Sequence, residues 1–187
     1  ARRNNLARVL VAADASPGVC ERVRELGLAD EATTDLANAV AGAGLVILCV
    51  PVGANEIVGK AIGPALTSDA IVSDVGSVKG AVLAALSPHI PAGVHLIPAH
   101  PVAGTEHSGP DAGFATLFLN RWCILTPPAD ADALAVHKLS NFWTAAGSNV
   151  EVMAQLCGHH GKVGRPRDWL TREKGMGALL EPYQSMD

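Results

Sequence analysis

Short aliphatic runs alternate with segments that carry helix signals, and this alternation constrains the fold more than any other feature of the 187-residue chain. The runs predict strands at residues 8–14, 45–50, 70–74, 94–98, 122–126 and 149–153. Aromatic residues make up only 4% of the chain, so the core consists mostly of Ala, Val, Leu and Ile, which suits parallel strands covered by helices. We therefore predict an open α/β fold with a mostly parallel sheet and right-handed crossovers.

The segments between these runs have the residues that start and stop helices. Ser16 is a good N-cap before Pro17, and Gly27 ends that helix. Thr34 can cap a second helix that ends at Gly42. Further helices are expected at residues 54–66 and 77–86, the latter beginning at Ser77. The last predicted helix is capped by Asp130 or Asp132, ends at Gly147, and places on one face Val136, Leu139, Trp143 and Ala146.

Composition and charge exclude several classes of partner. The net charge is −4, and no basic stripe or basic-aromatic pattern indicates nucleic acid. The longest apolar run, residues 45–54, is too short to span a bilayer and contains Pro51. No hydrophobic signal region follows the start of the chain. The four cysteines are widely separated, so we expect reduced thiols in a cytoplasmic protein without membrane or nucleic-acid partners.

Polar residues follow the predicted strand 94–98, at the end of a strand where open α/β sheets bind ligands. His100 precedes Pro101, which favours an extended backbone at the histidine, and we expect it in a polar loop. A neutral imidazole can accept a proton from a hydroxyl at physiological pH. The alternative is a structural or surface histidine. Thr105 and Glu106 follow in the same loop, either at a ligand site or in hydrogen bonds that stabilise the loop.

Asp14 ends the first predicted strand, where a carboxylate can accept both ribose hydroxyls of NAD. A 2′-phosphate would meet a like charge there, so NAD is favoured over NADP. The alternative is a loop aspartate that caps the next helix together with Ser16.

Two further turns follow predicted strands. After Val50, Pro51 fixes the exit of the chain and Gly53 allows a ligand to approach closely, although many strand-to-helix turns use proline and glycine. After Asp74, Gly76 permits a tight turn. Ser77 is then either an N-cap or a hydroxyl near the ligand. Lys79, one turn into the helix, is either a solvent-exposed helix residue or a charge near the ligand.

Residues 99–110 (AHPVAGTEHSGP) and 74–79 (DVGSVK) resemble the two signature motifs of the prephenate and arogenate (cyclohexadienyl) dehydrogenases, NAD(P)-dependent enzymes of tyrosine biosynthesis. The resemblance implies a Rossmann-like cofactor domain in which Asp14, Val50, Pro51, Gly53, Asp74 and Gly76 bind NAD. It also implies that His100 takes the proton of the substrate's ring hydroxyl while a hydride leaves the ring carbon that bears this hydroxyl. Loss of carbon dioxide then makes the ring aromatic. Ser77 would orient the imidazole, and Thr105 and Glu106 would contact the substrate at the mouth of the site.

The resemblance covers residues 1–154, which we expect to be an incomplete dinucleotide-binding domain. The glycine-rich first turn of such domains does not occur here, and in the family it would lie just before Ala1. Loss of the first strand should expose two strand edges. Residues 155–187 are expected to be a divergent, irregular tail. In the family, a helical domain that binds substrate and forms the homodimer occupies this place. Because the tail replaces that domain, we expect impaired activity.

Two alternatives remain open from the sequence. One is a different dehydrogenase of the same fold that acts on 3-hydroxy acids, and another is a nucleotide-binding module without catalysis. A metal site at Cys157, His159 and His160 is not expected, because adjacent histidines on a loop rarely converge on one ion.

Overall fold

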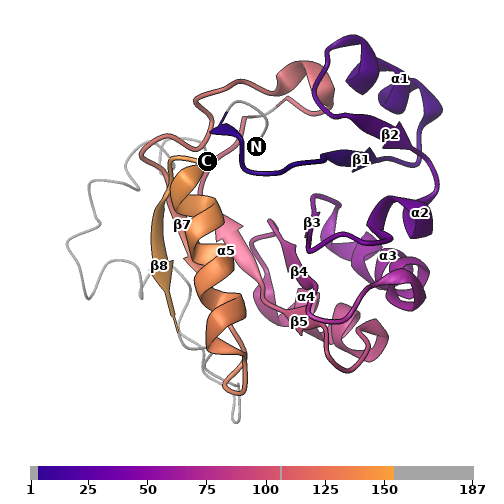
Figure 1. The fold of residues 1–187 in the computed structure, drawn as a ribbon. Coiled ribbons are helices and arrows are strands. Elements are labelled where there is room, and N and C mark those ends of the chain that lie inside the picture. Colours follow the sequence, from indigo (N-terminus) through magenta and orange to yellow (C-terminus); the bar gives the residue numbers. More distant parts are fainter. Residues whose placement is uncertain (1–3, 106, 154–187) are drawn as a thin grey trace. The chain divides into compact units, whose positions relative to one another are not determined.

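The computed structural model describes residues 4–105 and 107–153 (Figure 1). Strands and helices alternate along these residues, as the sequence predicts. The strands are β1 Val11–Ala13, β2 Glu31–Thr33, β3 Leu45–Leu48, β4 Ile71–Asp74, β5 His95–Leu96, β6 Ala99–Pro101, β7 Trp122–Leu125 and β8 Asn149–Val152. The α-helices are α1 Pro17–Glu25, α2 Leu36–Val40, α3 Asn55–Ile62, α4 Lys79–Leu86 and α5 Ala133–Ala145. The predicted tail, 155–187, lies outside the described residues, as do Cys157, His159 and His160.

The strands pair mostly in parallel, which confirms that part of the prediction. β1 pairs with β2, and β3, β4 and β5 follow one another in a second group, all in parallel. β7 pairs in parallel with β8 and antiparallel with β6, so β6 is the exception to the parallel arrangement. Within the described ranges no strand lies between β1 and β3 to pair with both of them. Each of these two strands is therefore paired on one side only and is the edge strand of its sheet.

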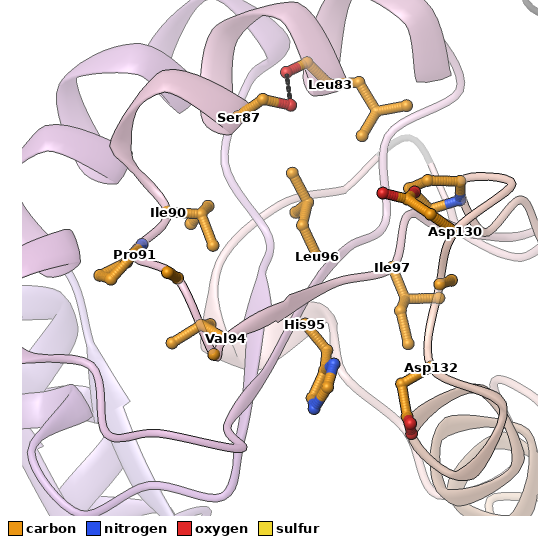
Figure 2. Close-up of a pocket in the computed structure, with 14 residues that line it drawn as sticks. Leu83, Ser87, Ile90, Pro91, Val94, His95, Leu96, Ile97, Asp130 and Asp132 are labelled. Atoms are coloured by element: carbon orange, nitrogen blue, oxygen red, sulfur yellow. Dashed lines mark hydrogen bonds between the residues drawn. The ribbon is translucent and has the colours of Figure 1, made fainter.

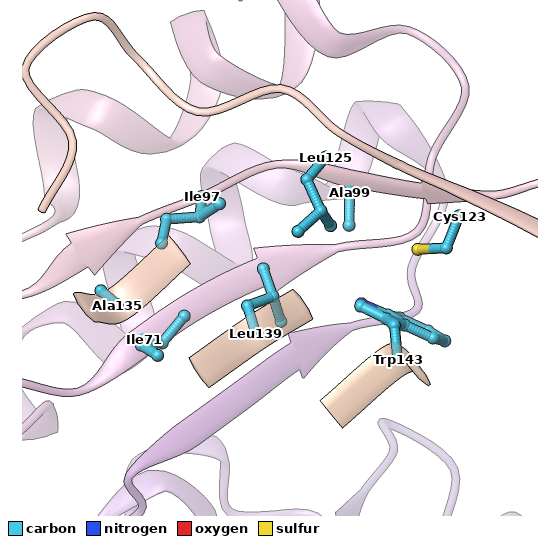
Figure 3. Close-up of a cluster of buried hydrophobic side chains, with 8 residues drawn as sticks. All are labelled: Ile71, Ile97, Ala99, Cys123, Leu125, Ala135, Leu139 and Trp143. Atoms are coloured by element: carbon cyan, nitrogen blue, oxygen red, sulfur yellow. The ribbon is translucent and has the colours of Figure 1, made fainter. Parts of the chain in front are cut away.

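Two buried clusters hold these elements together. One cluster gathers side chains of β4, β6, β7 and α5 and of the segment between β5 and β6 (Figure 3). It consists of Ile71, Ile97, Ala99, Cys123, Leu125, Ala135, Leu139 and Trp143. Helix α5 also packs beside β8. The other joins β3 and β4 to α2, α3 and α4, and consists of Val40, Leu48, Ile62, Val72, Val82 and Leu86. Burial of each Val, Leu or Ile side chain contributes about 1.5–3 kcal/mol, so β4, which supplies Ile71 and Val72 to the two clusters, is firmly anchored.

Helix starts agree with the sequence at two positions and differ at two. Ser16 caps α1 and Asp132 caps α5, as expected. Thr34 is not the cap of α2, because the carboxylate of Asp35 accepts the Asn38 N–H at 3.0 Å. Ser77 is not the cap of α4, because the first residue of this helix is Lys79 and Val78 occupies the capping position. No side chain forms a capping hydrogen bond there.

The predicted strand 94–98 is instead divided between two sheets. The Ile97 N–H donates to the Val72 carbonyl at 2.9 Å, and at the next residue the Pro98 carbonyl accepts from the Thr126 N–H at 3.0 Å. Neighbouring residues of an extended segment bond to opposite sides, so Ile97 faces β4, Pro98 faces β7 and Ala99 again faces the β4 side, where side chains replace the backbone partner. The expectation that His100 lies in a loop is therefore wrong, since His100 is the central residue of β6.

In the described residues, no helix is both long enough and apolar enough to cross a membrane.

Candidate functional site

The carboxylate of Asp74, at the end of β4, is the centre of a hydrogen-bond network. The residue is 2% exposed. Its Oδ2 accepts the Gly76 N–H at 2.9 Å, and its Oδ1 accepts the Ala99 N–H at 3.3 Å. A buried carboxylate requires such partners, because an uncompensated charge is costly in a protein interior. The network makes Asp74 part of the frame that connects β4 to β6.

Lys79, at the first position of α4, provides the countercharge. Its Nζ donates to Asp74 Oδ2 at 2.5 Å and to the Ala99 carbonyl at 2.6 Å. Burial lowers the pKa of the Lys79 ammonium, while the hydrogen bond to Asp74 acts in the opposite direction. The sequence left open whether Lys79 is a solvent-exposed helix residue or a charge near a ligand. Its side chain is 13% exposed, so the solvent-exposed alternative is wrong.

His100 lies one residue beyond this network. It is half-buried between Ala99 and Pro101, which are both buried. Burial lowers the pKa of the imidazole, the positive charge of Lys79 lowers it further, and Asp74 partly offsets these effects. The ring makes no hydrogen bond to the rest of the described chain. At neutral pH this histidine is uncharged and has a nitrogen lone pair with which it can accept a proton.

Ser77 is exposed in the turn between Asp74 and α4. No hydrogen bond joins its hydroxyl to the His100 ring in the part of the chain that is described. Asp74 and Lys79 on either side of Ser77 contact Ala99, the neighbour of His100, and that Ser77 and His100 act in one site stays a prediction. The orientation of the imidazole by Ser77 stays a prediction.

The carboxylate of Asp14 is exposed immediately after β1. Its Oδ1 accepts the Ser16 N–H at 2.8 Å, and the Ser16 hydroxyl accepts the Val19 N–H at 3.4 Å. This agrees with the capping alternative for Asp14. Because the side chain is exposed, the same carboxylate can also meet a ligand from solvent.

The two glycines of the predicted cofactor site differ in their surroundings. A Cβ added to Gly53, in the turn that Val50 and Pro51 begin, would meet nothing within 4 Å. A Cβ added to Gly76 would lie 3.1 Å from Asp74 Oδ2. The φ of neither glycine is positive, so the turn at Gly76 does not depend on a left-handed backbone. Gly76 is needed instead because the Asp74 carboxylate approaches its backbone closely.

The loop after β6 holds the remaining predicted residues. Thr105 is exposed, and its hydroxyl both accepts the His107 N–H at 3.3 Å and donates to the His107 carbonyl at 3.4 Å. These bonds agree with a loop-stabilising role. Glu106 lies outside the described residues. Over residues 4–105 and 107–153, no cluster of three or more His, Cys, Asp or Glu side chains could hold a metal ion.

A cavity of about 380 Å³ lies elsewhere, beside β5 and the segment that leads into it (Figure 2). Its lining includes Ser87, His95, Asp130 and Asp132, and contains none of the predicted site residues. Two of these groups already serve the fold, because Ser87 donates to the Leu83 carbonyl at 2.7 Å and Asp132 caps α5. The cavity therefore gives no support to a second reaction centre.

Comparison with known proteins identifies the family. The family model described as prephenate dehydrogenase, nucleotide-binding domain, matches residues 1–152. A cyclohexadienyl dehydrogenase from Zymomonas mobilis is 44% identical over 150 residues, covering 80% of this chain and 50% of the relative. A prephenate dehydrogenase from Bacillus subtilis is 27% identical over 141 residues, covering 75% of this chain and 38% of the relative. The chain thus spans half or less of the length of these curated relatives.

Solved structures agree with this assignment. Prephenate dehydrogenase from Aquifex aeolicus, in complex with hydroxyphenyl propionate and NAD+, matches with a TM-score of 0.74 at 29% identity, covering 82% of this chain and 53% of that one. Arogenate dehydrogenase from Synechocystis gives the same TM-score, identity and coverage. Fold, motifs and relatives converge on one family of oxidoreductases. The chain belongs to the prephenate dehydrogenase family, and residues 1–152 are its nucleotide-binding domain.

Proposed function

We propose that this domain acts in the NAD-dependent oxidative decarboxylation of prephenate or arogenate, with His100 as the group that accepts the proton of the ring hydroxyl. The observation that carries the proposal is the state of His100, which is half-buried beside Lys79 in an environment that lowers its pKa. A catalytic base must be unprotonated at the working pH and near the proton that it removes. A surface histidine in water lacks this lowering of the pKa, so a larger fraction of it would be protonated at the working pH.

The proposed chemistry divides between the substrate and the chain. His100 takes the hydroxyl proton, which allows the carbon that bears the hydroxyl to form a carbonyl as hydride leaves it. Bound NAD supplies the acceptor for that hydride. The bond to the ring carboxylate then breaks, carbon dioxide leaves, and the bonding pair moves into the ring. The π pair of the carbonyl moves onto its oxygen, which takes back the proton from His100, so the product is an aromatic phenol. Ser77, in the turn before α4, is proposed to hold the imidazole through its hydroxyl.

The residues at the strand ends fit NAD. Asp14 offers an exposed carboxylate after β1, which suits the two ribose hydroxyls and opposes a 2′-phosphate. The open space beside Gly53 leaves room for a ligand next to the backbone after β3. We propose that Val50, Pro51 and Gly76 complete this surface. Asp74 is also proposed on this side of the site, although its carboxylate has its partners within the chain.

The substrate is proposed to lie against the loop after β6, where Thr105 and Glu106 contact it. In the intact enzyme we expect a helical domain to supply the rest of the substrate site and the homodimer contact.

The test is an assay of the purified protein with NAD and either prephenate or arogenate. NADH formation with an equal amount of carbon dioxide supports the proposal. Faster NADH formation from a ring-free 3-hydroxy acid would assign the domain to another dehydrogenase reaction. Calorimetry that detects NAD binding, together with no turnover of any of these substrates, would indicate a nucleotide-binding module.

A further inference from the structure

We infer that Asp74 and Lys79 form a clamp on the backbone of Ala99 and so act as positioning residues for His100. We use the name Ala99 clamp for the contacts of these two side chains with the Ala99 N–H and carbonyl. The inference rests on the proposed function, because positioning matters only if His100 takes part in the reaction.

The backbone of Ala99 needs partners that β7 does not provide. The Thr126 N–H bonds to the Pro98 carbonyl at 3.0 Å, and the Val102 N–H bonds to the Trp122 carbonyl at 2.7 Å. In an antiparallel ladder hydrogen-bonded and non-hydrogen-bonded pairs alternate, so Ala99 and its partner Leu125 form a non-hydrogen-bonded pair. The N–H and carbonyl of Ala99 therefore point away from β7. Ala99 is 0% exposed, and water cannot satisfy these two groups.

The backbone of β4 does not satisfy them either. The ladder between β4 and the strand beside it ends with the bond from Ile97 to Val72. Beyond that point, side chains replace the backbone of β4. Asp74 Oδ1 accepts the Ala99 N–H at 3.3 Å, and Lys79 Nζ donates to the Ala99 carbonyl at 2.6 Å. The two side chains are themselves joined at 2.5 Å, so both contacts belong to one rigid unit.

The Ala99 clamp is anchored on both sides. Asp74 is the last residue of β4, which supplies both buried clusters, and Lys79 is the first residue of α4. The Gly76 N–H fixes the second oxygen of the carboxylate at 2.9 Å. Charge-assisted hydrogen bonds are shorter and about twice as strong as neutral ones, and the Lys79 bond to the Ala99 carbonyl at 2.6 Å is of this kind, whereas the Asp74 contact with the Ala99 N–H at 3.3 Å is longer. Lys79 is therefore the stronger half of the clamp.

Fixing Ala99 also fixes the next residue. Successive side chains of a strand point to opposite faces, so the clamp sets both the position and the face of the His100 imidazole. The ring itself has no hydrogen bond to the described residues, and its placement therefore depends on its backbone. A misplacement of about 1 Å in a reacting group can cost about 100-fold in rate, which makes such a support significant.

The experiment compares Lys79→Gln with the matched control Lys60→Gln, since Lys60 is an exposed lysine of α3 without a buried partner. We expect Lys79→Gln to lower kcat by about 10- to 100-fold, with the Kd for NAD unchanged, and to shift the carbonyl ¹³C resonance of Ala99 and the ring resonances of His100. Lys60→Gln should change none of these. A folded Lys79→Gln protein with wild-type kcat and unchanged resonances would overturn the clamp.

A second variant keeps the test decisive if Lys79→Gln does not fold. Lys79→Arg keeps the charge pair with Asp74, but its planar guanidinium cannot place a donor as the ammonium does. We expect this variant to fold and to lose part of kcat, with a smaller shift of the Ala99 carbonyl resonance. Wild-type kcat together with an unshifted resonance would contradict the clamp.

Failure of the clamp is distinguishable from failure of the proposed function. If His100→Asn abolishes turnover while the Lys79 variants behave as wild type, His100 is catalytic and the clamp is wrong. If His100→Asn turns over like wild type, the proposed role of His100 is wrong, and a kcat effect at Lys79 would then need a different explanation that also overturns the clamp.

Discussion

Lys79 and Asp74 lie 2.5 Å apart in a setting that leaves their side chains 13% and 3% exposed. Removal of the ammonium would leave a buried carboxylate without its countercharge, which costs more than the pair contributes as a whole. We expect Lys79→Met to lower the free energy of unfolding by about 3–5 kcal/mol, as measured by urea denaturation. Lys60→Met should change it by less than about 0.5 kcal/mol, because that lysine is exposed. A loss below about 1 kcal/mol in Lys79→Met would show that the pair is weakly coupled to folding.

The same pair should control the titration of His100. Lys79 lowers the pKa of the imidazole and Asp74 raises it, while burial, the largest cause, lowers it in either case. Lys79→Gln should therefore raise the pKa of His100, and Asp74→Asn should lower it. The ring proton resonances followed by NMR from pH 4 to 8 measure both shifts. Shifts in the same direction, or none, would contradict this electrostatic account.

That titration also sets the expected pH profile. A base works when it is unprotonated, so kcat/KM should fall as the pH drops through the pKa of His100, which lies below the ordinary value of 6.5. In Lys79→Gln the fall should begin at a higher pH than in wild type. Rate profiles with coincident acid limbs would show that another group controls this limb.

Much of this architecture could be predicted from the sequence, because it depends on local signals. The aliphatic run before Val50 and the helix that begins at Ser16 and Pro17 form strand and helix as expected. Asp132 is one of the two residues predicted to cap the last helix. The two motifs that carry the family resemblance are also in contact, because Asp74 and Lys79 of one bond to Ala99 of the other.

The remaining features depend on tertiary contacts that no local pattern encodes. The segment after Ile97 leaves the ladder to β4 and pairs with β7, which lies far away in the sequence, and this places His100 in β6. Gly76 indicated a tight turn, but its close packing against the Asp74 carboxylate could not be predicted from the sequence. The sequence left two roles open for Lys79 and did not predict its bond to the Ala99 carbonyl. Its only signal was a basic residue five positions after an aspartate that ends a buried strand.

Asp14 provides a test of cofactor choice. Asp14→Asn keeps an oxygen that can accept the Ser16 N–H, so the start of α1 should remain intact. Loss of the charge should weaken NAD binding by about tenfold and narrow the preference for NAD over NADP, since charged hydrogen bonds are worth about 1 kcal/mol more than neutral ones. Calorimetry with both nucleotides measures this, with Glu21→Gln on α1 as the control. Unchanged affinities would restrict Asp14 to its capping role.

The two glycines should respond differently to an added methyl group. Gly53→Ala meets open space, so stability should be unchanged while NAD binds more weakly. Gly76→Ala places a Cβ 3.1 Å from Asp74 Oδ2 and should lower the free energy of unfolding by about 1–3 kcal/mol. Thermal unfolding and NAD titration of both variants separate the effects. Wild-type NAD affinity in Gly53→Ala would remove this turn from the proposed cofactor surface.

The most direct measurement is the turnover of His100→Asn, with His137→Asn as a control because His137 is an exposed histidine of α5. Removal of the base should lower kcat for NADH formation from prephenate or arogenate by about 100- to 10,000-fold and leave the Kd for NAD unchanged. His137→Asn should behave as wild type. Wild-type kcat in His100→Asn would contradict the assignment of His100 as the proton acceptor.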